Sequence, residues 1–188
     1  MKLVKIFRFL SLLFLLIGLL LLFKPTYFYI KSYLVQFILN KNWDYFKDNG
    51  VIKNNFLDVI PSGKIIIPEI GLDNIVLKGA DQYTLSYGLG LVDNGVAIHE
   101  NRYNIVISGH RDTQFNKLKS VNKGHRIILE HIEGKSEYIV DNIVLVDPSE
   151  ITYLEKNNFN TLTLITCYPF NYVGAAPLRM IVVGKLSL

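Results

Sequence analysis

The hydrophobic pattern begins with an almost unbroken apolar stretch. Residues 9–23 read FLSLLFLLIGLLLLF, and four further apolar side chains precede them. The stretch from Leu3 to Phe23 is long enough to cross a hydrocarbon layer of ~30 Å as a helix. Basic side chains at Lys5 and Arg8 can extend toward the headgroups at one end. The pattern therefore predicts a transmembrane helix within residues 1–24.

Two other interpretations of this stretch compete with the anchor. A cleaved signal peptide would show small residues after the apolar run, whereas Lys24 is followed by the bulky sequence PTYFY. Tyr27 and Tyr29 suit a membrane interface instead. A buried core helix is the remaining alternative. Basic residues ahead of the span favour a cytoplasmic N-terminus, so we expect an uncleaved, single-pass anchor in the cell membrane and an extracellular domain.

Helical periodicity continues beyond the anchor in residues 30–57. Its apolar members are Ile30, Tyr33, Leu34, Phe37, Ile38, Trp43, Tyr45 and Phe46. This spacing predicts one or two amphipathic helices, with a break at residues 40–42, where two asparagines flank a lysine. We expect a helical linker over residues 25–62. A stalk and a helix packed on the domain both fit this pattern.

From Gly63 onward, short β-rich runs alternate with turn residues. The expected strands are Lys64–Ile67, Asn74–Lys78, Gly95–Ile98, Asn104–Ser108, Arg126–Ile132, Glu137–Val146, Thr161–Thr166 and Leu178–Leu186. Short helical turns are expected at 113–118 and 150–157. Eight strands predict a mainly β domain over residues 63–188, arranged as a small closed barrel or a sandwich.

Composition removes several classes of function. The net charge is +4, but four basic residues and no acidic ones lie before residue 25, so the remainder is neutral. A neutral domain argues against a nucleic-acid binder. A single cysteine excludes an internal disulfide and a multi-cysteine metal site. The four histidines form no His-Glu-x-x-His motif, and nucleotide-binding loops are absent. We therefore expect no metal and no cofactor.

Three residues stand out as candidates for catalysis. Cys167 ends the strand-like run TLTLITC, His110 follows the apolar run NIVISG, and Arg179 lies among apolar residues in the last expected strand. Each has an ordinary alternative when taken alone: a buried apolar cysteine, a surface histidine, and an outward-facing strand arginine.

Together these three residues supply complementary chemistry. A thiolate nucleophile needs a base or a cationic neighbourhood. A histidine can protonate a leaving amine, and an arginine can stabilise a developing oxyanion. If the last two expected strands are neighbours, Cys167 and Arg179 share one groove. Because His110 precedes Cys167, a papain-like order is disfavoured; a chymotrypsin-like enzyme would carry Gly-x-Cys-Gly, which is absent.

The same residues resemble the sortases, which are membrane-anchored cysteine transpeptidases of bacterial cell surfaces. Residues 163–167 read TLITC and match the family signature TLxTC, and Arg179 follows at the family's distance. Residues 108–113, SGHRDT, resemble the segment that holds the sortase histidine. The run CYPFNYVGAAPLR is most similar to class D. At residues 124–125 this chain has Gly-His where family members often have Gly-Asp.

The resemblance implies an eight-stranded sortase barrel over residues 63–186 and a specific reaction. Cys167 would attack an LPxTx-type sorting signal of a surface protein or pilin and form a thioester. An amine of a peptidoglycan precursor or of a pilin would resolve that thioester. His110 would act as acid and base, and Arg179 would steady the oxyanion. Thr166 and Tyr168 would line the substrate groove, with residues 148–160 setting peptide preference. No calcium site can be assigned.

Two alternatives remain open. A membrane-tethered barrel that binds without catalysis would be expected to lack at least one of the three residues, and all three are present. A cysteine hydrolase would use the same thioester half-reaction and pass the acyl group to water, so the sequence does not separate it from a transpeptidase.

Overall fold

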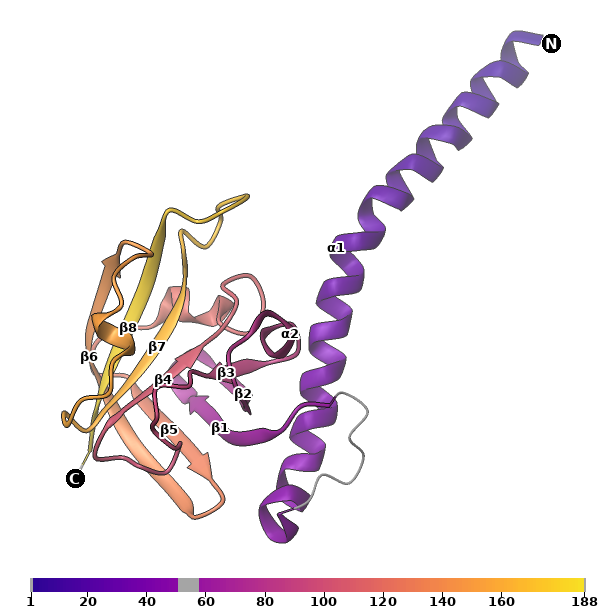
Figure 1. The fold of residues 1–188 in the computed structure, drawn as a ribbon. Coiled ribbons are helices and arrows are strands. Elements are labelled where there is room, and N and C mark those ends of the chain that lie inside the picture. Colours follow the sequence, from indigo (N-terminus) through magenta and orange to yellow (C-terminus); the bar gives the residue numbers. More distant parts are fainter. Residues whose placement is uncertain (1, 51–57, 188) are drawn as a thin grey trace.

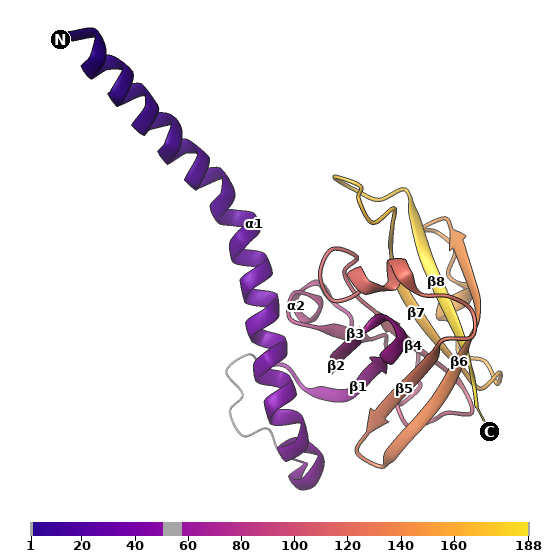
Figure 2. The ribbon, with the colours of Figure 1, turned by 180° about the vertical axis from the view of Figure 1, so that it is seen from behind.

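Eight strands close into a barrel in the computed structural model, which describes residues 2–50 and 58–187 (Figures 1 and 2). The strands are β1 (Pro61–Ile67), β2 (Leu72–Lys78), β3 (Leu89–Leu91), β4 (Asn104–Ser108), β5 (Arg126–His131), β6 (Gly134–Val146), β7 (Thr161–Tyr168) and β8 (Leu178–Leu186). Around the barrel they follow the order β1-β2-β3-β4-β7-β8-β6-β5. The β2–β3 and β4–β7 pairs are parallel. The expected mainly β architecture and barrel are confirmed.

The core fills the barrel because the strands alternate inward and outward side chains. On β7, Leu162 and Leu164 belong to the buried core, as does Val182 on β8. Inward positions on β7 are therefore even-numbered. Odd-numbered residues, including Cys167, lie on the outer face of the sheet.

Two features of the strand prediction were wrong. Residues 95–98 form turns and irregular structure rather than a strand. The strand-like pattern arises because Val96 and Ile98, two residues apart in a loop, both pack into the core. The strand that the sequence prediction missed is β3, whose three residues read LGL. Its central Gly90 is needed because an added Cβ would lie 2.5 Å from the carbonyl oxygen of Gly79.

The short helices are η1 (Pro68–Ile70), α2 (Gln82–Leu85), η2 (Asn116–Ser120) and η3 (Thr152–Leu154). Asp81 caps α2, since its side chain accepts hydrogen bonds from the amides of Tyr83 and Thr84. The elements η2 and η3 fall at the helical turns expected around residues 113–118 and 150–157.

A single long helix, α1 (Lys2–Asn49), precedes the barrel. Its segment Val4–Phe23 is long and apolar enough to cross a membrane, and none of that segment is buried against the described chain. The break expected at residues 40–42 is absent. Leu39 and Trp43 are buried on either side of it, and this tertiary packing outweighs the weak helix preference of asparagine. The division of the chain at residues 24 and 62 stays a prediction.

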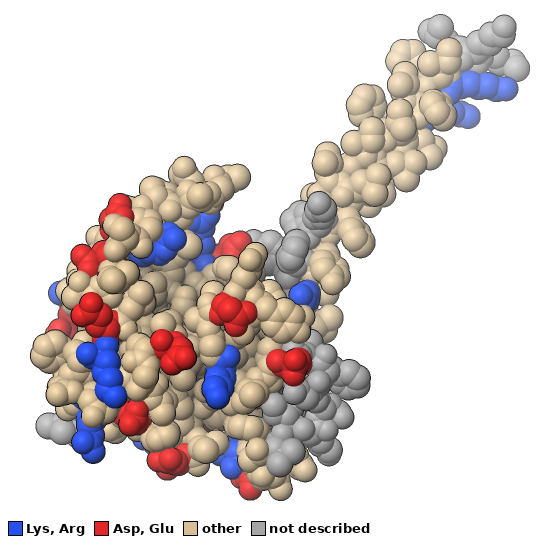
Figure 3. All heavy atoms as spheres, viewed as in Figure 1, with Lys and Arg blue, Asp and Glu red and all other residues tan. Residues whose placement is uncertain are grey.

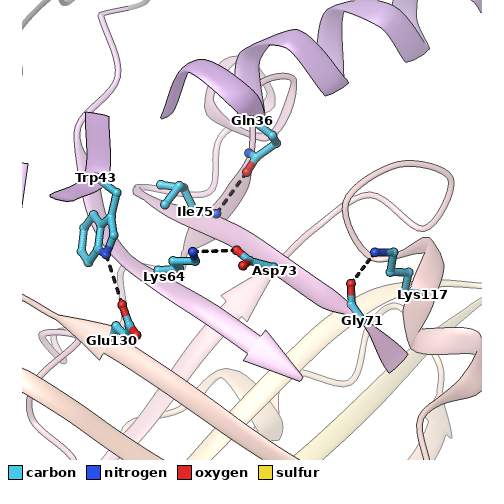
Figure 4. A network of polar contacts seen from close by, with 8 residues as sticks. All are labelled: Gln36, Trp43, Lys64, Gly71, Asp73, Ile75, Lys117 and Glu130. Carbon is cyan, nitrogen blue, oxygen red and sulfur yellow. Dashed lines mark hydrogen bonds and ion pairs between the residues drawn. The ribbon is translucent and has the colours of Figure 1, made fainter. Parts of the chain in front are cut away.

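The second half of α1 is packed on the barrel rather than forming a free stalk (Figure 4). Trp43 is 1% exposed, and its indole N–H donates to Glu130 Oε2 on β5 at 3.3 Å. The Gln36 side chain accepts from the Ile75 amide at 3.0 Å and donates to the Tyr87 carbonyl at 3.0 Å. These polar contacts fix the register of α1 against β2, while apolar packing stabilises the contact.

The segment after β4 is also held to the end of the barrel near α1. Lys117 on η2 donates to the Gly71 carbonyl (Figure 4), and the Asn74 amide donates to the Gln114 carbonyl at 2.9 Å. This segment contains His110, so the same strand β2 that receives α1 also supports the chain around the candidate histidine.

Candidate active site

Strands β7 and β8 bring Cys167 and Arg179 together. The two strands are antiparallel, and Cys167 lies directly opposite Arg179 in their register. Side chains of directly opposed residues share one face with Cβ atoms ~5 Å apart. Both residues are half-buried, so the thiol and the guanidinium lie at the surface of the outer face, where a peptide could contact them.

His110 comes from the strand on the other side of β7. Ser108, the last residue of β4, is paired with Ile165 in the parallel ladder. The pairing continues past the strand end, because the Gly109 amide donates to the Ile165 carbonyl at 3.1 Å. The Thr166 hydroxyl then donates to the Gly109 carbonyl at 2.7 Å. His110 is the next residue, so its backbone leaves the sheet beside the strand end that carries Cys167.

The three candidates therefore lie on three adjacent strands or strand ends, with β7 in the middle. This arrangement fits nucleophilic acyl transfer, because the thiol can be approached by a proton donor from the β4 side and by an oxyanion stabiliser from the β8 side. His110 is exposed, and its carbonyl accepts from the Phe115 amide at 3.0 Å. The imidazole is thus free to reach solvent while its backbone is fixed.

Thr166 and Tyr168 lie on the opposite face of β7 from Cys167. Thr166 is buried and holds the Gly109 carbonyl. Tyr168 packs against the core, with its ring 6.1 Å from that of Phe170 in an edge-on arrangement. These contacts support the strand end and the His110 segment. Direct contact of either residue with a substrate stays a prediction.

Arg179 has polar neighbours of its own. Its Nη1 donates to the carbonyls of Leu178 at 3.1 Å and Ala176 at 3.3 Å. Asp147 follows Val146, the β6 partner of Arg179. Hydrogen bonds from the Ser149 hydroxyl and amide hold the pKa of Asp147 below its usual range, and the charge of Arg179 acts in the same direction. Asp147 is therefore an anionic neighbour of the Arg179 position.

Asn104, the first residue of β4, is a supporting residue that sequence reasoning missed. It is 1% exposed, and its Oδ1 accepts from the hydroxyls of Thr163 at 2.7 Å and Thr161 at 3.0 Å. Its Nδ2 donates to the carbonyls of Tyr153 at 2.9 Å and Glu155 at 3.2 Å. One buried amide thus fastens the connection between β6 and β7 to the outer face that carries Cys167. The signal in the sequence was a single asparagine at the start of an otherwise apolar strand.

Asn104→Ala is expected to destabilise the fold and loosen that connection. Removal of the amide leaves two buried threonine hydroxyls and two carbonyls short of partners, which costs about 3 kcal/mol in the free energy of unfolding. Urea unfolding would measure the change, with the exposed Asn101→Ala as the matched control. Equal stability of the two variants would contradict the role assigned to Asn104.

The other histidines lie away from these strands. His99 and His131 have ring centroids 6.3 Å apart, and burial lowers the pKa of His131. His125 Nδ1 accepts from the Asn122 amide at 3.3 Å and so supports a turn. Within residues 2–50 and 58–187, no group of three or more His, Cys, Asp or Glu side chains is arranged to hold a metal ion.

Comparison with known proteins agrees with this geometry. The model of the sortase domain matches residues 65–187. Sortase D of Bacillus subtilis is 38% identical over 126 residues, which cover 66% of this chain and 63% of that protein. The match thus spans less than two thirds of that relative's length. Sortase A of Listeria monocytogenes is 25% identical over 201 residues, covering 92% of this chain and 88% of that protein.

Solved structures show the same barrel. The pilus-related Sortase C of Group B Streptococcus is similar with a TM-score of 0.61 and 28% identity, over 68% of each chain. The Clostridium perfringens Sortase D5 transpeptidase has a TM-score of 0.66 at 23% identity, over 81% of this chain and 98% of that one, which supports the fold alone. The family expected from the TLITC, SGHRDT and Arg179 positions is confirmed, and class D members are among the relatives. The chain belongs to the sortase family.

Proposed function

We propose that the chain is a membrane-anchored cysteine transpeptidase that cleaves LPxTx-type sorting signals. The observation that carries the proposal is the placement of Cys167 on β7, directly opposite Arg179 on β8 and beside the His110 segment. The family supplies the reaction class, since sortases are cysteine transpeptidases. The relatives named above include a pilus-related enzyme, so surface proteins and pilins are the proposed substrates.

The first half-reaction forms a thioester. The Cys167 thiolate attacks the carbonyl carbon of the threonine in the sorting signal, and the carbonyl π electrons move onto oxygen. The Arg179 guanidinium stabilises that oxyanion. Collapse of the intermediate breaks the C–N bond, and His110 gives its proton to the leaving amine.

The second half-reaction runs the same steps in reverse order. An amine of a peptidoglycan precursor or of a pilin attacks the thioester carbonyl, and His110 accepts a proton from that amine. The C–S bond then breaks, which returns the Cys167 thiolate and leaves a new amide bond. If water attacks instead, the enzyme is a hydrolase, and the acceptor decides between the two outcomes.

We further propose that the Val4–Phe23 segment of α1 anchors the enzyme with its N-terminus in the cytoplasm and the barrel outside. The segment has the required length and apolar surface. Lys5 and Arg8 lie near the end that would face the cytoplasm, in agreement with the preference of positive charge for that side. Since α1 is also packed on the barrel, the anchor and the catalytic domain form one unit.

Intact-protein mass spectrometry tests the proposed reaction. The full chain in detergent is incubated with LPxTx peptides, with and without an added amine. We expect a mass increase equal to the acyl fragment, located at Cys167 and discharged by the amine to give the ligated product. Discharge only to free acid would indicate a hydrolase. A folded protein whose thiol reacts with a labelling reagent but gives no adduct with any peptide would contradict the sorting-signal substrate.

A further inference from the structure

The connection between β7 and β8, residues 169–177, extends from the barrel toward the same side as the first half of α1. Both views show this yellow loop on the side of the barrel to which the N-terminal part of the helix runs (Figures 1 and 2). The loop leaves β7 immediately after Cys167 and Tyr168 and returns at Arg179. The end of the barrel that carries the candidate nucleophile therefore faces the side of the proposed membrane span.

The tip of this loop is largely apolar and carries no charged side chain. Residues 169–177 read PFNYVGAAP and contain no Asp, Glu, Lys, Arg or His. Val173 is 96% exposed and Tyr172 is 46% exposed. In Figure 3 the tip is free of blue and red, whereas the face of the barrel below it carries both colours. A tyrosine beside an exposed valine at a projecting tip suits the interfacial layer of a bilayer, where tyrosine side chains are enriched.

The loop is held in place at its tip. Arg111, the residue after His110, donates from Nη2 to the carbonyls of Tyr172 at 2.6 Å and Gly174 at 3.2 Å. Its guanidinium carbon also lies 5.9 Å from the centroid of the Tyr172 ring. The two bonded carbonyls flank Val173, so the arginine fixes the backbone on both sides of the most exposed apolar side chain. The tip is thus presented outward in a defined shape.

The chain lengths from the span to the barrel contact and from Cys167 to the loop tip are similar. Phe23 lies at the end of the span, and Gln36 bonds to β2. The helical segment between these two residues is about 20 Å long at 1.5 Å per residue. Six residues of extended chain from Cys167 to Val173 reach at most about 20 Å. α1 is continuous from the span to Gln36 and Trp43, and both side chains are bonded to the barrel (Figure 4), so the helix holds the barrel close to the end of the span.

We propose that Tyr172 and Val173 form a second membrane contact, in which the tip of the β7–β8 loop is seated in the interfacial layer of the bilayer. The inference rests on the proposed anchoring by Val4–Phe23. This contact places the strand end with Cys167 next to the lipid surface, so that substrates held at the membrane reach the thiol while they remain bound to the membrane. It also gives Arg111 a role as the positioning residue that shapes the contact.

Depth-dependent tryptophan quenching tests the contact. The full chain is placed in bilayer nanodiscs whose lipid acyl chains are brominated near the headgroups, and Val173→Trp is compared with Phe159→Trp. Phe159 is the matched control because it is 75% exposed and precedes the opposite end of β7. Wild-type emission, which comes from Trp43, is subtracted. We expect the Val173→Trp variant to lose about half of its added emission, as for an interfacial aromatic residue, and the Phe159→Trp variant to lose little.

A third variant, Phe14→Trp within the span, separates the two proposals. Quenching at position 14 by chains brominated at depth, together with equal quenching at 173 and 159, would overturn the loop contact and leave the anchoring intact. Absence of quenching at position 14 would overturn the anchoring, and the loop contact with it.

To exclude insertion driven by the new tryptophan at 173, Tyr172→Trp is measured with and without Val173→Asp. The added charge is expected to remove most of the quenching at 172, and unchanged quenching would contradict the contact.

Discussion

Cys167→Ala is expected to abolish the acyl-enzyme and to lower turnover about 10⁴-fold or more, the scale seen when a nucleophile is removed from a catalytic unit. The side chain is half-buried on the outer face of β7, and alanine keeps the backbone and most of the volume. The fold should therefore survive, because the hydrogen bonds of β7 to β4 and β8 do not involve the thiol. The absence of the acyl adduct in the mass spectrum and the loss of ligated product would both report the effect.

The matched control for this variant is Ile165→Val, two residues earlier on the same face of β7. Both substitutions remove a small part of one outward side chain, and only Cys167 carries the proposed nucleophile. Ile165→Val is expected to keep nearly full activity. Turnover by Cys167→Ala at the rate of the control, with a circular dichroism spectrum unchanged from wild type, would end the covalent mechanism.

The placement of Cys167 and Arg179 on one face could be predicted, because successive side chains of a strand point to opposite faces of the sheet. Two strands joined by a loop of ten or so residues are often neighbours, and in an antiparallel pair directly opposed residues share a face. The sequence pattern puts Cys167 at the end of one strand and Arg179 at the start of the next. The structure puts them in register, directly opposite one another. The barrel followed from the number of short strands, although one of the eight was assigned to residues 95–98 instead of β3.

The contacts missed from the sequence all join segments far apart in the chain. Asn104 binds residues about 50 positions later, Arg111 binds a loop about 60 positions later, and Gln36 binds β2 about 40 positions later. Periodicity reports which face of an element is apolar, but it carries no information on which distant carbonyl a polar side chain will meet. The continuity of α1 also depends on a contact between distant segments, because burial of Trp43 on β5 stabilises the helix across residues 40–42.

His110→Ala is expected to lower kcat by 10²–10⁴-fold with a smaller effect on KM, as for loss of a general acid. The imidazole is exposed, and the contact that fixes this segment is made by the His110 carbonyl to the Phe115 amide, which alanine retains. Stability should therefore be unchanged. His99→Ala is the matched control, since His99 is likewise exposed but lies near His131 on β5 rather than beside β7.

The leaving group distinguishes an acid from a residue that only shapes the site. An amine must be protonated as the C–N bond breaks, whereas a nitrophenolate leaves without a proton. Acylation of His110→Ala by a nitrophenyl ester of the same acyl peptide should therefore approach the wild-type rate, while acylation by the amide stays slow. A defect of equal size with both substrates would contradict proton donation by His110 and would assign the residue to substrate binding or to the geometry of the β4 end.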